Sequence, residues 1–161
     1  MKTEIEKMPS VRGVRHLRQM RQMLDYALPF TGLSAHQPGA VRFIIVTPAR
    51  MCALNMLHLG HEGTTDVITY DLRQEGDFLS GVFGEEPLLA EIYLCPEVAR
   101  QYAAKFGTTP AYELFLYAVH GLLHLGGEDD LTDEARASMR AAEKRVLTEV
   151  TNRFGLPDFL H

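Results

Sequence analysis

The chain has 161 residues, 46% of them apolar and 23% charged, which is the composition of an ordinary globular protein. This length fits one sizeable core, so we expect a single domain over residues 1–161. No stretch is long and apolar enough to span a bilayer, because the run at 114–119 ends at His120. The net charge of −5 argues against a protein that coats nucleic acid through its overall charge, so any contact with RNA needs a local basic patch.

Cysteine usage and the N-terminus both indicate a cytoplasmic protein. Cys52 and Cys95 could form at most one disulfide, and their apolar neighbours favour buried free thiols in a reducing compartment. The N-terminus lacks the basic region and the apolar run of a secretory signal. We therefore expect a cytoplasmic protein without a membrane partner.

Hydrophobic periodicity predicts an α+β fold, in which a small mixed sheet of three to four strands packs with about five helices. In chain order, we expect an edge strand at 2–6, a helix at 11–28, a loop at 29–39, a strand buried on both faces at 41–47 and a helix at 48–57. These are followed by a strand at 65–70, a long loop at 73–87, a strand at 88–94, helices at 96–106 and 110–125, and a last helix from 132.

Basic residues recur every three positions in the first predicted helix, at Arg12, Arg15, Arg18 and Arg21. A charge row opposite an apolar stripe is usually a solvated face. In an acidic protein it is also the best candidate for contact with RNA phosphates or the ribosome, so both interpretations stay open.

The segment 120–130 contains the candidate metal-binding and catalytic residues. His120 and His124 are four positions apart, which places both imidazoles on one face of the helix predicted at 110–125. Spacing alone is weak, because seven histidines in 161 residues give about 0.3 such pairs by chance. The helix is apolar on nearly every face, so both imidazoles are expected to be buried and to need polar partners. Gly121 between them is a poor helix former, which predicts a close neighbour at that position.

A carboxylate completes the predicted site. Gly126 and Gly127 turn the chain, so that Asp129 or Asp130 can face back toward the two histidines. Two imidazoles, one carboxylate and an open position for water are a catalytic zinc pattern. The alternative is a pair of core histidines that bond to backbone carbonyls beside a solvated acidic turn.

These residues resemble the His-Gly-x-Leu-His-Leu-x-Gly-Tyr-Asp-His signature of the YbeY endoribonucleases. The similarity covers about 55–147 in several blocks that keep their order. Leu-Asn at 54–55 and Thr-Asp-Val-Ile-Thr-Tyr at 65–70 are similar to family blocks before the signature, and Glu-Ile-Tyr-Leu at 91–94 takes the place of Gly-Asp-Ile-x-Ile. Met139 and Glu143 match a Met-x₃-Glu in the family's final helix.

Two departures from the family pattern bear on the chemistry. Asp130 occupies the position of a third histidine, and a carboxylate there adds a negative charge but remains a competent zinc ligand. Leu59 stands where the family often has an arginine, which would stabilise the phosphoryl transition state. We expect His61, or else His58, to supply that charge.

The resemblance implies a zinc-dependent, single-strand-specific endoribonuclease that acts in rRNA 3′-end maturation and ribosome quality control. It implies one Zn²⁺ per chain, held by His120, His124 and Asp130, with His120, His124 and His61 as the catalytic residues. The implied partners are single-stranded RNA, rRNA and the ribosome or its small subunit, and no DNA. An alternative is a non-catalytic ribosome-associated factor whose metal only ties the turn to the helix. A metalloprotease is disfavoured, because Gly121 stands where those enzymes place a general-base glutamate.

Overall fold

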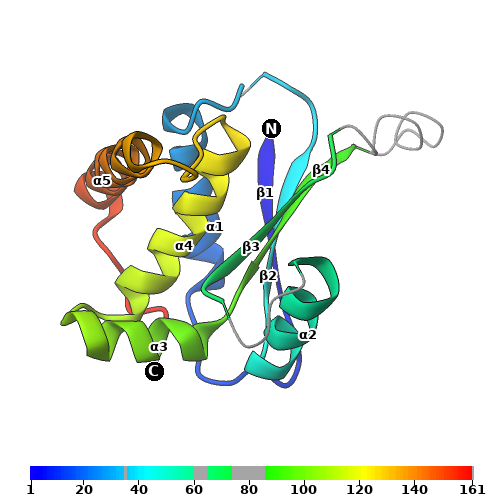
Figure 1. Cartoon of the computed structure of the whole chain (residues 1–161), viewed down its shortest axis with the longest axis vertical. Coiled ribbons are helices and arrows are strands. Elements are labelled where there is room, and N and C mark those ends of the chain that lie inside the picture. The colour runs from blue at the N-terminus through cyan, green and yellow to red at the C-terminus, as the bar shows by residue number, and fades with distance from the viewer. Residues whose placement is uncertain (35, 60–64, 74–85, 161) are drawn as a thin grey trace.

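The computed structural model describes residues 1–34, 36–59, 65–73 and 86–160. Within these ranges, four strands form one mixed sheet surrounded by five α-helices and a 3₁₀ helix (Figure 1), which confirms the predicted α+β class. The strands are β1 (Lys2–Lys7), β2 (Ala40–Ile45), β3 (Val67–Asp71) and β4 (Leu88–Leu94). The helices are α1 (Leu17–Ala27), η1 (Leu28–Phe30), α2 (Pro48–Leu59), α3 (Pro96–Phe106), α4 (Pro110–Leu125) and α5 (Asp133–Phe154).

The strand order in the sheet is β1-β2-β4-β3, so β1 lies at an edge as predicted. β1 and β4 both run parallel to β2, whereas β3 runs antiparallel to β4 and forms the other edge. Because successive side chains point to opposite faces, the register defines two surfaces. Phe43 and Ile92 are paired on one face, and Ile44 and Tyr93 are paired on the other.

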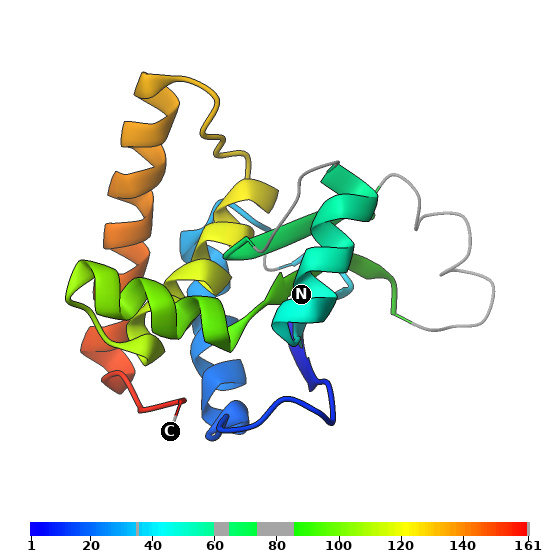
Figure 2. The ribbon, with the colours of Figure 1, turned by 60° about the horizontal axis from the view of Figure 1, so that its bottom comes forward.

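Helices cover both faces of the sheet (Figure 2). The larger core contains α1, α4 and α5 with Phe43 and Ile92 of the sheet. α2 covers the opposite face, where Met51 and Leu54 pack with Ile68. No helix in the described ranges is both long and apolar enough to cross a membrane. Cys52 is half-buried and Cys95 is buried, and both are free thiols, as predicted.

The first helix begins later than predicted. α1 starts at Leu17 instead of residue 11, because Gly13 and His16 adopt left-handed backbone conformations with φ of 73° and 61°. This stretch instead binds the C-terminal segment, since Arg15 donates to the carbonyl of Asp158 at 2.9 Å. The predicted row of four arginines on one helix is therefore wrong. Only its last two members, Arg18 and Arg21, lie on α1.

Candidate metal centre

The helix α4 carries both histidines of the predicted site. The hydroxyl of Thr109 caps its first turn by accepting from the amide of Tyr112 at 3.1 Å, and Pro110 fills the first helical position. Because α4 lies between the sheet and α5, its residues are buried on nearly every side. His120 and His124 lie one turn apart on the part of its surface that stays half-buried.

Two glycines allow close approaches that fix α4 in place. A Cβ at Gly121 would lie 2.9 Å from two carbon atoms of Ile92 and 3.0 Å from the hydroxyl of Thr69, which confirms the predicted close neighbour. A Cβ at Gly126 would lie 1.8 Å from the carbonyl oxygen of Thr31, so no other residue fits there. Gly121 thus holds α4 against the sheet, and Gly126 holds its end against the segment after η1.

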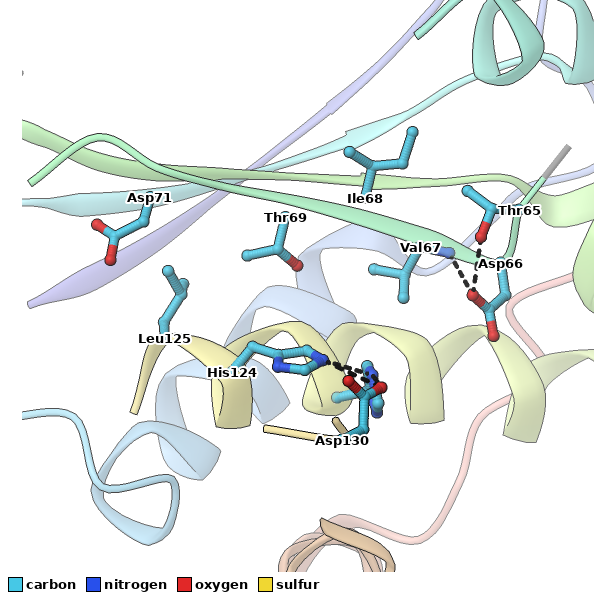
Figure 3. A pocket seen from close by; sticks show the side chains of 10 residues that line it. Thr65, Asp66, Val67, Ile68, Thr69, Asp71, His124, Leu125 and Asp130 are labelled. Atoms are coloured by element: carbon cyan, nitrogen blue, oxygen red, sulfur yellow. Dashed lines mark hydrogen bonds and ion pairs between the residues drawn. The ribbon is translucent and has the colours of Figure 1, made fainter. Parts of the chain in front are cut away.

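The structure brings His120, His124 and Asp130 together, with one donor atom from each within 4.8 Å of the others. Figure 3 labels His124 and Asp130 of this group. The two imidazole Nε2 atoms are 2.9 Å apart, and Oδ2 of Asp130 lies 3.8 Å from that of His120 and 3.7 Å from that of His124. Two ligand atoms of a tetrahedral zinc ion are about 3.3 Å apart, given bond lengths of about 2.0–2.1 Å. These separations bracket that value, so the donor triad of His120, His124 and Asp130 could hold a metal ion of this size.

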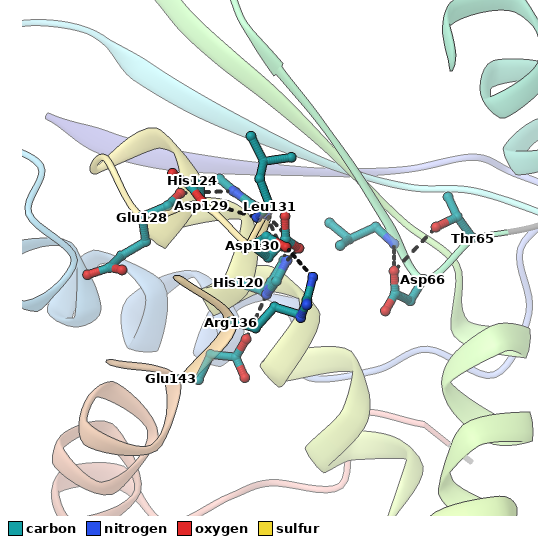
Figure 4. A network of polar contacts seen from close by, with 11 residues as sticks. Thr65, Asp66, His120, His124, Glu128, Asp129, Asp130, Leu131, Arg136 and Glu143 are labelled. Carbon is teal, nitrogen blue, oxygen red and sulfur yellow. Dashed lines mark hydrogen bonds and ion pairs between the residues drawn. The ribbon is translucent and has the colours of Figure 1, made fainter. Parts of the chain in front are cut away.

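Both imidazoles are oriented through their other nitrogen (Figure 4). Nδ1 of His120 lies 2.6 Å from the carboxylate of Glu143 on α5, and Nδ1 of His124 lies 3.0 Å from the carbonyl oxygen of Glu128. A carbonyl and a carboxylate accept hydrogen bonds, so Nδ1 carries the hydrogen in each ring. Nε2 is therefore the nitrogen that each ring has left to bind a metal, and the two Nε2 atoms lie 2.9 Å apart. A cation beside them could accept both lone pairs.

Acidic groups favour a cation at this point. Burial opposes protonation of His120, but the hydrogen bond and charge of Glu143, with the charges of Asp66 and Asp130, outweigh it and raise the pKa of the imidazole. The same carboxylates attract a metal ion. Asp66 also orders the start of β3, because its Oδ1 accepts from the amide of Val67 at 2.8 Å and from the hydroxyl of Thr65 at 3.3 Å.

The loop after α4 separates the two candidate carboxylates. Oδ1 of Asp129 accepts from the amide of Leu131 at 3.1 Å, so this side chain caps the turn. Asp130 faces the histidines instead, and a guanidinium nitrogen of Arg136 donates to its backbone carbonyl at 3.2 Å. Arg136 also pairs with Asp133 in the first turn of α5. The carboxylate of Asp130 is therefore the one that completes the donor triad.

The donor triad opens into a cavity of about 530 Å³ between α4 and β3. We call it the β3 cavity. It is open to solvent, so ions and small ligands can reach the triad. Its lining residues are Thr65, Asp66, Val67, Ile68, Thr69, Asp71, His120, His124, Leu125 and Asp130.

Sequence reasoning gave no role to three contributors to this site: the carboxylate of Glu143, the carbonyl of Glu128 and the side chain of Arg136. Glu143 carried a signal, because it belongs to the Met-x₃-Glu that is similar to the family's final helix. His61 lies outside the described residues, as do the side chains of His58 and Leu59. The roles predicted for His61 and His58, and the effect of Leu59, therefore stay predictions.

Comparisons with known proteins place this chain in a family. The family model described as endoribonuclease YbeY matches residues 3–151. The endoribonuclease YbeY of Elusimicrobium minutum is 33% identical over 121 residues, which cover 74% of this chain and 80% of that protein. The endoribonuclease YbeY of Bacillus licheniformis is 30% identical over 142 residues, covering 87% and 86%. The solution structure of TM1509 from Thermotoga maritima shares the fold, with a TM-score of 0.62, 24% identity and coverage of 94% of this chain and 91% of that one. The chain therefore belongs to the YbeY endoribonuclease family.

Proposed function

We propose that the chain is a cytoplasmic, single-domain endoribonuclease that uses zinc to cleave single-stranded RNA in rRNA 3′-end maturation and ribosome quality control. The observation that carries the proposal is the donor triad, whose two imidazoles face each other at 2.9 Å beside the carboxylate of Asp130. Membership of the YbeY family supports the reaction class, because the relatives are named endoribonucleases. The ribosome or its small subunit is the proposed partner.

The residues of the triad suit zinc in a catalytic role. Among the described residues, His120, His124 and Asp130 would hold the zinc ion, and all three line the β3 cavity, from which water or a ligand can reach it. Zinc bound there would supply a Lewis acid for the phosphoryl oxygen and would lower the pKa of a water molecule toward about 7. Glu143 holds His120 in the orientation and tautomer that expose Nε2, and the carbonyl of Glu128 does the same for His124.

The charges around the β3 cavity support a role for metal in RNA binding as well. Asp66, Asp71 and Asp130 line it, and these carboxylates repel phosphate. Arg73 pairs with Asp71 at 2.6 Å and neutralises one of them. A divalent cation at the triad would offset the remaining charge. A single strand suits this cavity, because an unstacked nucleotide can enter where a duplex does not fit.

Two other functions fit the sequence less well. In a metalloprotease a glutamate would occupy the position of Gly121, but a Cβ there would already lie 2.9 Å from Ile92 and 3.0 Å from the hydroxyl of Thr69, so the larger side chain of glutamate would be crowded. A non-catalytic ribosome-associated factor would use the metal only to tie the loop of Asp130 to α4. Only three protein ligands for a metal come together among the described residues, which favours an enzyme over this alternative, since structural zinc sites are closed by four protein ligands.

The test of the proposal is the cleavage of a single-stranded RNA by zinc-loaded wild type and by His124→Ala, prepared in parallel. We expect the variant to lose both zinc and cleavage, because metal and activated water are lost together. His36→Ala, which removes an exposed histidine from the loop before β2, is the matched control and should cleave like wild type. Equal cleavage by wild type and His124→Ala would assign the activity to a contaminating ribonuclease. The ribosome-factor function would then be preferred, with co-sedimentation with ribosomes as its readout.

A further inference from the structure

A second cavity shares two lining residues, His120 and Asp66, with the β3 cavity. It has a volume of about 560 Å³, within the range of ligand pockets, and we call it the α3 cavity. His120 and Asp66 line both cavities, so the candidate metal centre lies at their junction. The lining residues of the α3 cavity are Asp66, Tyr102, Lys105, Phe106, Glu113, Leu116, Tyr117, His120 and Glu143.

An exposed aromatic side chain forms part of the rim of this cavity. Phe106 ends α3 with 60% of its surface exposed, and it is the one aromatic among the large apolar side chains that the described residues expose. Its ring stacks on Tyr102, with centroids 5.6 Å apart and planes tilted by 11°. The ammonium of Lys105 lies 5.5 Å from the centre of the Phe106 ring. A flat, exposed ring that already belongs to a stack is a surface on which a further ring can lie.

The charged residues of the α3 cavity favour different positions for the base and ribose of a nucleotide and for its phosphate. The carboxylates of Asp66, Glu113 and Glu143 line its interior, so a phosphate is disfavoured there. Carboxylates accept hydrogen bonds from the amino groups of bases and the hydroxyls of ribose. Lys105 is the only lysine or arginine among the described lining residues, and it lies at the rim beside Phe106. The cavity therefore suits a nucleoside, with its phosphate outside near Lys105.

We propose that the α3 cavity binds one nucleotide next to the scissile phosphate, with its base stacked on Phe106 and a neighbouring phosphate paired with Lys105. This inference rests on the proposed endoribonuclease function, because it places the RNA chain across His120 from one cavity to the other. Stacking recognises any base, so Phe106 contributes affinity and positioning without strong sequence preference.

The test is the binding of zinc-loaded protein to fluorescent single-stranded RNA pentanucleotides, each carrying one abasic ribose at a different position. In wild type, one position of the abasic ribose should weaken binding of the oligonucleotide by about 5- to 150-fold, as the loss of one stacked base does. That position is the one whose base stacks on Phe106. Phe106→Ala should weaken binding of the intact oligonucleotide by a similar factor. The two losses should not add, because each removes the same contact.

Three variants give the experiment its controls. Phe106→Trp keeps an aromatic surface and should bind like wild type or more tightly. Leu57→Ala removes another exposed apolar side chain, from the helix on the opposite face of the sheet, and should leave binding unchanged. Lys105→Ala should make the binding affinity less dependent on salt concentration, by the amount expected for the loss of about one phosphate contact.

The outcomes separate this inference from the proposed function. The stacking site is wrong if Phe106→Ala binds RNA like wild type. It is also wrong if the affinity lost in Phe106→Ala adds fully to the affinity lost with the abasic ribose at every position. Either result can occur even though wild type cleaves RNA. If wild type and its Phe106 variants differ in binding as expected but neither wild type nor any variant cleaves, the nucleotide site stands and the endoribonuclease function fails. If zinc-loaded wild type does not bind the pentanucleotides, both proposals are overturned.

Discussion

Nδ1 of His120 and the carboxylate of Glu143 lie 2.6 Å apart, although 23 residues separate them in the chain. The histidine belongs to α4 and the glutamate to α5. The packing of these two helices therefore orients the imidazole of His120 relative to the other two members of the donor triad. With 15% of its side-chain surface exposed, Glu143 is too buried to be a solvated charge of α5. Its partner is instead the histidine that a metal would need in one fixed tautomer.

The first prediction therefore concerns Glu143→Gln, which keeps the shape of the side chain but removes its charge. We expect zinc affinity to fall about 10- to 100-fold, as it does when the partner of a metal-binding histidine is replaced. Competition with a chromogenic chelator measures this, and circular dichroism should show an unchanged fold. Glu149→Gln, at an exposed position of the same helix, is the matched control. Wild-type affinity in Glu143→Gln would mean that His120 needs no such partner.

The second prediction distinguishes the two neighbouring aspartates. Asp130→Ala should weaken zinc binding severely, because it removes one of three donors, whereas Asp129→Ala should keep zinc and lose only a turn contact. Asp130→His should retain zinc and make the metal-bound water more acidic, because one negative charge is lost. Metal analysis of the three purified variants measures the first two effects, and the pH dependence of cleavage measures the third. Full zinc content in Asp130→Ala would remove this residue from the site.

How far the sequence predicts the site depends on whether its contacts are local. His120 and His124 are identified by helical spacing, since both depend on a single element. The turn at Gly126 and Gly127 indicates that a carboxylate returns to the pair, but local spacing does not choose between Asp129 and Asp130. That choice depends on hydrogen bonds in the loop, where the amide of Leu131 donates to the side chain of Asp129.

Longer-range features of the fold were harder to predict. Strand and helix positions follow from hydrophobic patterns, and the α+β class follows from them. The start of α1 does not, because left-handed conformations at Gly13 and His16 are stabilised by contacts with the distant C-terminal segment. The contact of Glu143 with His120 likewise depends on how two helices pack, which no local pattern specifies.

The third prediction concerns Arg136, which ties the loop of Asp130 to α5. Arg136→Ala removes the donor to the backbone carbonyl of Asp130 and should weaken zinc affinity about 2- to 10-fold, as the loss of one partly exposed hydrogen bond does. Arg136→Lys should restore part of the affinity, since an ammonium can donate to the same carbonyl. Isothermal titration with zinc measures both variants. Arg145→Ala, at an exposed position of α5, is the control. Unchanged affinity in Arg136→Ala would show that the loop holds Asp130 in place without this contact.

The last prediction tests whether the contact between α4 and the sheet positions the metal centre. In Gly121→Ala, the new methyl group would lie 2.9 Å from two carbons of Ile92 and 3.0 Å from the hydroxyl of Thr69. Relieving this overlap costs about 1–3 kcal/mol, whereas alanine stabilises a helix by only about 1 kcal/mol relative to glycine. We therefore expect a lower free energy of unfolding in urea. Zinc affinity should fall too, because α4 must move and His120 moves with it.

A second variant decides whether Ile92 is the cause. Ile92→Val removes the Cδ1 atom, one of the two carbons that the new methyl group would meet, at a cost of about 0.5–1.5 kcal/mol on its own. Combined with Gly121→Ala it should cost less than the sum of the two single changes, because the overlap is partly relieved. Zinc affinity should recover in the same double variant. If the two costs simply add and zinc affinity stays low, the approach of α4 to Ile92 is not what positions His120.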